Sequence, residues 1–170
     1  MIANYHTHTR WCNHAKGEAE DYIKEAIRLG LKEIAITDHV PHIDNTDPAR
    51  MKWEEFDAYN QLLDEAIDKY KNQITIYKGF ECEYYPEALD FYKKLINEYG
   101  YTVMVLGQHR CGKDRYYNAF TNMNKEALEI YNTQITYLDF IASFTILQRS
   151  SFVFVYKFLH FTDCTLQSLR

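Results

Sequence analysis

Short apolar segments that alternate with amphipathic ones constrain the fold of this chain more than any other feature. Residues Ile2 to His8 and Leu31 to Thr37 have the character of strands, and Gly17 to Leu29 between them carry apolar side chains at helical spacing. Such a unit places its two strands parallel, with the helix outside the sheet. The alternation continues, with helices predicted over Lys52–Asn72, Pro86–Tyr99 and Asn122–Thr136 and strands over Ile74–Tyr84, Thr102–Gly107 and Leu138–Ala142. We therefore expect an α/β fold built on a parallel sheet.

Two histidines stand one residue apart in the first predicted strand. Side chains two residues apart on an extended strand point to the same side, so His6 and His8 are expected to aim at one point in space. Neutral imidazole nitrogens are good ligands for Zn, Fe, Ni or Mn. An edge strand with two solvent-facing histidines is the alternative for this pair alone.

The later strands end in residues of the same kind. His39, Glu81 and His109 each stand at the end of a predicted strand, and the carboxyl ends of the strands in a barrel of alternating strands and helices form one face. Ligand-type residues at the same end of several strands predict a metal site on that face.

Composition excludes several classes of function. The chain has 170 residues and a net charge of −5, with no basic stripe that would indicate a nucleic-acid partner. We expect a cytoplasmic protein without a membrane partner, because no signal peptide or apolar membrane-spanning run is evident. The four cysteines form no CxxC pair, which argues against a disulfide framework. Oligomeric state is not predicted.

Five short motifs, in order, resemble the polymerase and histidinol phosphatase (PHP) superfamily, and in particular its monofunctional histidinol-phosphatase branch. The motifs are His6-Thr7-His8-Thr9, Cys12-Asn13-His14-Ala15-Lys16-Gly17, Ile36-Thr37-Asp38-His39, Lys78-Gly79-Phe80-Glu81-Cys82-Glu83 and Leu106-Gly107-Gln108-His109. The resemblance covers roughly residues 2 to 142. It implies a distorted (β/α)7 TIM-like barrel with a cluster of up to three divalent ions (Zn, Fe, Mn or Ni) at its C-terminal face.

The resemblance also implies roles for single residues. His6 and His8 would bind one metal, His14 and His39 a second, and Glu81 would bridge the first metal to a third, which His109 would bind. The implied reaction is hydrolysis of L-histidinol phosphate to L-histidinol and phosphate in histidine biosynthesis, with His6, His8, Glu81 and His109 as the catalytic set.

Three further residues are candidate contacts for the substrate. Arg10 and Arg110 are candidates for the phosphate, although a solvated loop charge is the alternative for Arg110. Glu83 is a candidate for the amino group of the substrate, with a surface acid on the face of Glu81 as its alternative. Asp38 is expected either to orient an imidazole or to cap a helix.

The match to the superfamily stops after Ala142. The histidine followed by Pro-Asp that the family places there is replaced by Ser143-Phe144-Thr145, and a later Asp-x-His motif is absent. We therefore divide the chain into a PHP-type barrel portion, 1–142, and an atypical tail, 143–170, which carries a strand-prone run over 152–159. An altered C-terminus that leaves the barrel incomplete is the simpler hypothesis, and a genuine shortened variant is the alternative. Either way we expect the activity of the chain to be impaired.

Three functions remain open from the sequence. The first is a metal-dependent histidinol phosphatase, the second a PHP phosphoesterase of another substrate, and the third a non-catalytic metal-binding remnant. The loop Val40 to Arg50 is expected to act as a lid or to set substrate choice.

Overall fold

The computed structural model describes residues 2–41, 45, 47–83, 85–107, 109–111, 117–118 and 153–156. Its main feature is a parallel sheet with the strand order β1-β2-β3-β4-β7. The strands are β1 (Ala3–Asn4), β2 (Glu33–Ile36), β3 (Thr75–Cys82), β4 (Val103–Leu106) and β7 (Val153–Tyr156). Strands β5 (Arg110–Cys111) and β6 (Tyr117–Asn118) form a separate antiparallel pair. The predicted α/β class with a parallel sheet is confirmed.

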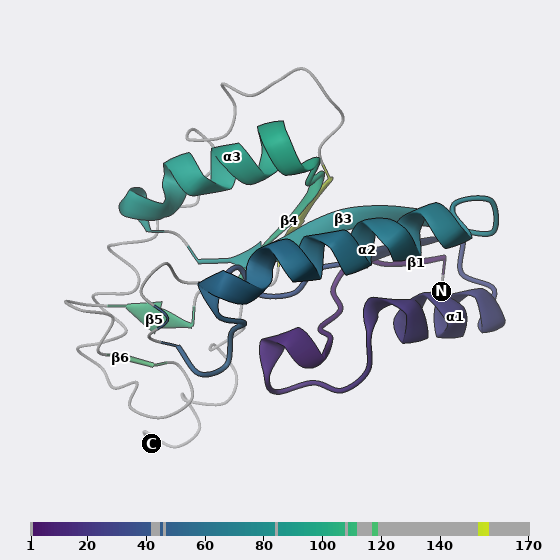
Figure 1. Ribbon diagram of the computed structural model, residues 1–170, viewed down its shortest axis with the longest axis horizontal. Helices are drawn as coiled ribbons and strands as arrows, with labels where there is room; N and C mark the ends of the chain where they lie inside the picture. Colours follow the sequence, from purple (N-terminus) through teal and green to yellow (C-terminus); the bar gives the residue numbers. More distant parts are fainter. Residues whose placement is uncertain are drawn as a thin grey trace, which may run out of the picture.

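In the part of the chain that the structure describes, helices connect β1 to β2, β2 to β3 and β3 to β4 (Figure 1). They are α1 (Ala19–Arg28), α2 (Phe56–Tyr70) and α3 (Leu89–Tyr99), and short 3-10 turns occupy η1 (Arg10–Cys12), η2 (Trp53–Glu55) and η3 (Pro86–Ala88). Side chains of the helices and strands share one apolar core, in which Ile23 from α1, Leu63 from α2 and Leu95 from α3 are each at most 1% exposed. Helices that pack on one another over parallel strands are the arrangement of a barrel portion.

The predicted elements agree with the structure in type and differ at their ends. The first strand is shorter than predicted, because regular pairing ends at Asn4 and the two histidines follow it. Helix α1 stops where expected, before Gly30, whose φ of +73° is the left-handed conformation that ends helices. The predicted helix over 52–72 begins with the 3-10 turn Trp53–Glu55, and the α-helix itself starts at Phe56.

The tail contributes to the sheet. Residues 153–156, within the run predicted to be strand-prone, form β7 and pair in parallel with β4 from Val103↔Val153 to Leu106↔Tyr156. This segment therefore extends the sheet, although the sequence indicated that the tail does not continue the rhythm of strands and helices. The predicted helix 122–136, the predicted strand 138–142 and the boundary at Ala142 lie outside the described residues. No helix among the described residues has the length and apolar character needed to cross a membrane.

Candidate metal centre

The segment that carries His6 and His8 stays extended beyond β1 and is fixed to the neighbouring strand. The Thr7 backbone N–H donates to Thr37 Oγ1 at 2.9 Å, and the Thr7 hydroxyl donates to the Ala35 carbonyl at 2.8 Å. With Thr7 held on that side, the histidines before and after it turn to the other side, and their Nε2 atoms lie 2.9 Å apart. The alternation expected of an extended segment therefore brings the two imidazoles together.

Glu81, in β3, completes a triangle with these two histidines. Its Oε2 lies 2.9 Å from His6 Nε2 and 2.9 Å from His8 Nε2, and the side chain is 3% exposed. Hydrogen bonds alone do not satisfy this triangle, because two N–H groups that both donate to Glu81 would also face each other at 2.9 Å. Two ligands about 2.1 Å from one ion and at right angles lie about 3 Å apart. The triangle thus has the dimensions of three ligands on one face of a divalent ion.

The charge state of Glu81 suits this arrangement. Burial raises the pKa of the carboxyl group, but hydrogen bonds from His6 and His8 outweigh that effect and lower the pKa below its ordinary value. Glu81 is therefore an anion at neutral pH and offers two oxygens as ligands.

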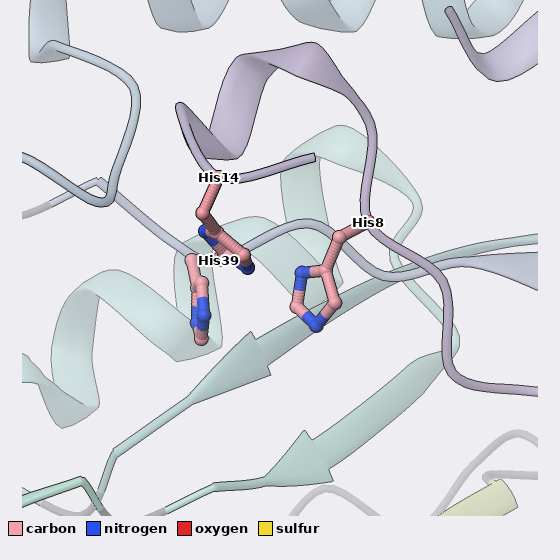
Figure 2. Close-up of side chains that lie close together, drawn as sticks. All are labelled: His8, His14 and His39. Carbon is pink, nitrogen blue, oxygen red and sulfur yellow. The ribbon is translucent and has the colours of Figure 1, made fainter. Parts of the chain in front are cut away.

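A second group joins His8 to His14 and His39, whose rings point toward one another (Figure 2). The turn η1 positions His14. Asn13, which ends this turn directly before His14, adopts a left-handed φ of 58° and reverses the chain. The His14 Nδ1 lies 2.7 Å from the Cys12 carbonyl oxygen, which can only accept, so this nitrogen carries the proton. The Nε2 lone pair of His14 is thereby left available to a metal.

A third group consists of His39, Glu81 and His109. The backbone of His39 forms a parallel bridge with Glu81, and the side chains are 3.6 Å apart at Nδ1 and Oε2. His109 Nε2 lies 3.4 Å from Glu81 Oε1, the second carboxylate oxygen. Burial, then the Arg50 charge, lower the pKa of His39, so its imidazole is neutral. The buried Nδ1 of His39 has no hydrogen-bond partner among the described residues. A bound metal ion would satisfy this nitrogen.

The three groups overlap, and their donor atoms fit divalent metals. His8, His39 and Glu81 each belong to two of these three groups, and His8 also forms a further group with Cys12 and Asp38, so the corresponding ion positions are adjacent. Imidazole and carboxylate ligands suit Zn, Fe, Mn and Ni. All six residues predicted as ligands, which are His6, His8, His14, His39, Glu81 and His109, thus lie in one cluster. Their action as metal ligands stays a prediction.

Cys12 and Asp38 lie beside His8 and His39 and fix the chain segments there. The sequence did not indicate these contacts. The Cys12 thiol donates to Asp38 Oδ1 at 2.9 Å, accepts the His39 backbone N–H at 3.1 Å, and lies 3.3 Å from His8 Nδ1. Asp38 also accepts the backbone N–H and hydroxyl of Thr9. Asp38 therefore neither orients an imidazole directly, as one prediction held, nor caps an α-helix, but fixes the turn that carries Cys12.

The structure places Glu83 differently from the prediction of a substrate contact. Its side chain is 1% exposed, and Oε1 lies 2.9 Å from Arg50 Nη2 and 3.2 Å from His109 Nδ1. Burial raises the pKa of Glu83, but the hydrogen bond from His109 and the charge of Arg50 outweigh this effect. The pKa of Glu83 is therefore below its ordinary value, and the carboxylate stays charged. A buried carboxylate behind a histidine favours a role in orienting His109 over contact with substrate. No local pattern in the sequence indicated Arg50.

The two arginines predicted to contact phosphate differ in what the structure describes. Arg10 is half-exposed, pairs with Glu18 and lies over the Trp11 ring at 4.2 Å, so it is engaged outside the histidine cluster. The phosphate contact of Arg10 stays a prediction. Arg110 opens β5, and its side chain lies outside the described atoms, so its role stays a prediction.

The fold and the site together define a class of protein, an α/β barrel portion with a cluster of histidine and glutamate side chains at the strand ends that could hold metal ions. A family model described as the PHP domain matches residues 4–151, so this chain belongs to the PHP domain family.

Individual relatives agree with this family. A protein of Schizosaccharomyces pombe named probable histidinol-phosphatase is 31% identical over 119 residues, which are 64% of this chain and 39% of that protein. A crystal structure from Listeria monocytogenes, described as a histidinol phosphatase, has a TM-score of 0.55 at 28% identity over 66% of this chain and 46% of its own. A histidinol phosphate phosphatase from Lactococcus lactis, with a TM-score of 0.54 at 21% identity over 65% and 41% of the two chains, shows the same fold. The chain spans less than half the length of these relatives.

Proposed function

We propose that this chain is a metal-dependent phosphomonoester hydrolase, with L-histidinol phosphate as its substrate. The observation that carries the proposal is the triangle of His6, His8 and Glu81, whose three atoms are 2.9 Å apart. Around it, His14, His39 and His109 would complete the sites of a divalent cluster. The names of the relatives supply the substrate, since the Lactococcus lactis structure is a complex with zinc, L-histidinol and phosphate.

Divalent ions would supply the positive charge that a phosphate dianion requires, and would lower the pKa of a water toward neutrality. The residues of the chain provide the setting for that chemistry. Glu81 offers one oxygen to the pair His6 and His8 and the other toward His109, so it would bridge two positions. His39 stays neutral and keeps the lone pair of one ring nitrogen. Arg110, which follows His109 directly, is the proposed phosphate contact.

The first experiment measures metal content and phosphate release on the same purified chain. Metal is determined by elemental analysis after loading with Zn²⁺ or Mn²⁺, and release is followed with L-histidinol phosphate. We expect bound metal and release above the uncatalysed rate, both lost when His6 and His8 are changed together to alanine. A Glu98→Gln variant, whose carboxylate is exposed and pairs with Lys94 away from the cluster, is the matched control.

The possible outcomes separate the candidate functions. Release from other phosphate esters but not from L-histidinol phosphate would contradict the substrate and favour a different PHP phosphoesterase. Stoichiometric metal without release from any ester would contradict hydrolysis and favour a metal-binding protein. A chain that binds no metal would overturn the whole proposal.

A further inference from the structure

Arg50 carries a buried positive charge for which the proposed function has given no use. Its side chain is 4% exposed, with Nη2 2.9 Å from Glu83 Oε1 and Nε 3.5 Å from Asp47 Oδ2. A buried guanidinium is costly unless it is paired, and its removal from such a pair leaves a buried carboxylate without compensation. This charge is therefore built into the interior for a structural or positional reason.

The partner of Arg50 reaches a proposed metal ligand. Glu83 Oε1, the oxygen that Arg50 contacts, accepts the His109 backbone N–H at 3.2 Å and lies 3.2 Å from His109 Nδ1. Since a carboxylate can only accept, His109 donates from Nδ1 and presents Nε2, the nitrogen 3.4 Å from Glu81 Oε1. One carboxylate oxygen thus joins Arg50 to the tautomer and direction of the His109 ring.

Arg50 also contacts the other segments that bear histidines. Its backbone carbonyl accepts Asn13 Nδ2 at 2.8 Å, directly before His14. Its Nη1 approaches the Val40 carbonyl at 3.4 Å, directly after His39. The side chain and backbone of Arg50 therefore contact the residues next to His14 and His39, in addition to Glu83, which contacts His109.

We propose that Arg50 is a positioning residue, which holds Glu83 so that Glu83 fixes His109 with Nε2 directed into the metal cluster. The expected effect on metal affinity rests on the proposed metal-binding function. The orientation of His109 does not, because it can be measured in the chain without metal. Residues that orient a histidine ligand typically contribute 10- to 100-fold to metal affinity.

The test uses the full chain and three variants of buried cations. Arg50→Met removes the charge and keeps much of the volume, and Arg50→Lys keeps the charge but not the planar fork. Lys78→Met is the matched control, because Lys78 is also buried, lies in β3 and pairs with one carboxylate, Asp64, away from the histidines. Unfolding by urea measures the stability of each variant without metal.

The first readout is the tautomer of His109 in the metal-free chain, from ring nitrogen chemical shifts. We expect the Nδ1–H form in the wild type and in Lys78→Met, and a mixture of both forms in Arg50→Met. The same tautomer in Arg50→Met as in the wild type would overturn the proposal. Should Arg50→Met not fold, Arg50→Lys is read in its place, with a smaller shift in the same direction expected.

The second readout is Zn²⁺ affinity by calorimetry, with a double-mutant cycle. Arg50→Met should weaken binding about 10- to 100-fold, and Lys78→Met less than about 3-fold. In a His109→Ala background, Arg50→Met should have a clearly smaller effect, because its route through His109 is already removed. Full additivity of the two changes would contradict the proposal. A wild type that binds no Zn²⁺ would refute the proposed function, while the tautomer would still decide the role of Arg50.

Discussion

Gly107 lies where any side chain would collide with the Glu81 carboxylate, so replacing it tests the geometry of the cluster directly. A Cβ on Gly107 would lie 1.7 Å from Glu81 Oε1, 2.7 Å from Glu81 Cδ and 2.9 Å from His109 Cε1. An ordinary van der Waals contact begins at 3.4 Å, so the carboxylate oxygen has to move by about 1.7 Å. Metal ligands tolerate only about 0.2 Å of displacement.

We therefore expect Gly107→Ala to weaken metal binding about 100-fold or more, since displacing a ligand should cost at least as much as removing a residue that orients one, which is about 10- to 100-fold. Overpacking should also lower the free energy of unfolding of the metal-free chain by about 1–3 kcal/mol. Calorimetric titration with Zn²⁺ and urea unfolding measure the two effects separately.

Gly79→Ala is the matched control for this prediction. Its Cβ would lie 2.7 Å from Thr37 Cγ2 and 3.0 Å from Val103 Cβ, so it also overpacks the interior, but it does not meet Glu81. We expect a comparable loss of stability and, because Thr37 holds the segment of His6 and His8, a loss of metal affinity that is clearly smaller than in Gly107→Ala. Equal Zn²⁺ affinity in Gly107→Ala and the wild type would refute the reasoning, because Glu81 would then bind metal from a different position.

Three further predictions concern the chain outside this contact. Removal of metal with a chelator should lower the thermal midpoint of unfolding, since free metal at 100 times its Kd adds about 2.7 kcal/mol to the free energy of unfolding. A melting curve that does not change with the chelator would count against a bound ion. Leu63→Ala, in the core at 1% exposure, should lower the free energy of unfolding by about 2–5 kcal/mol and leave Zn²⁺ affinity unchanged by calorimetry. Hydrogen bonds from Lys24, Lys69 and Tyr70 lower the pKa of Glu20 from 4.5 to about 2, so the stability from this contact is present above pH 4.5 and is lost as pH falls toward 2. The difference in urea midpoint between wild type and Glu20→Gln should shrink over that range, and a difference that grew on acidification would contradict the assignment.

The parts of the fold that follow from local periodicity were predictable from the sequence. The apolar run Leu31 to Thr37 and the amphipathic segment before it gave β2 and α1, with Gly30 marking the end of the helix. The strand-end positions of His39 and Glu81 followed from the same pattern, because parallel strands bring their carboxyl ends to one edge. The grouping of distant residues in the cluster was therefore accessible without coordinates.

Contacts that depend on the path of loops were not predictable. Arg50 meets Glu83 across 33 positions, and Cys12 meets Asp38 across 26, with no spacing rule to connect either pair. Arg10 carries the charge expected of a phosphate ligand, and its pairing with Glu18 at the surface was not evident from the sequence. Charge type indicates what a residue can bind, whereas the partner that it finds depends on the tertiary fold.

The measurement that tests the central claim most directly is the stoichiometry of Zn²⁺ bound by the wild type and by Glu81→Gln. Glu81 belongs to two of the three groups, and the amide that replaces it is a neutral and poorer ligand. The account predicts that the wild type binds metal in the presence of excess Zn²⁺ and that Glu81→Gln loses most of it, while Glu98→Gln does not. Equal binding by wild type and Glu81→Gln, or no binding by either, would contradict the claim that these residues form a metal centre.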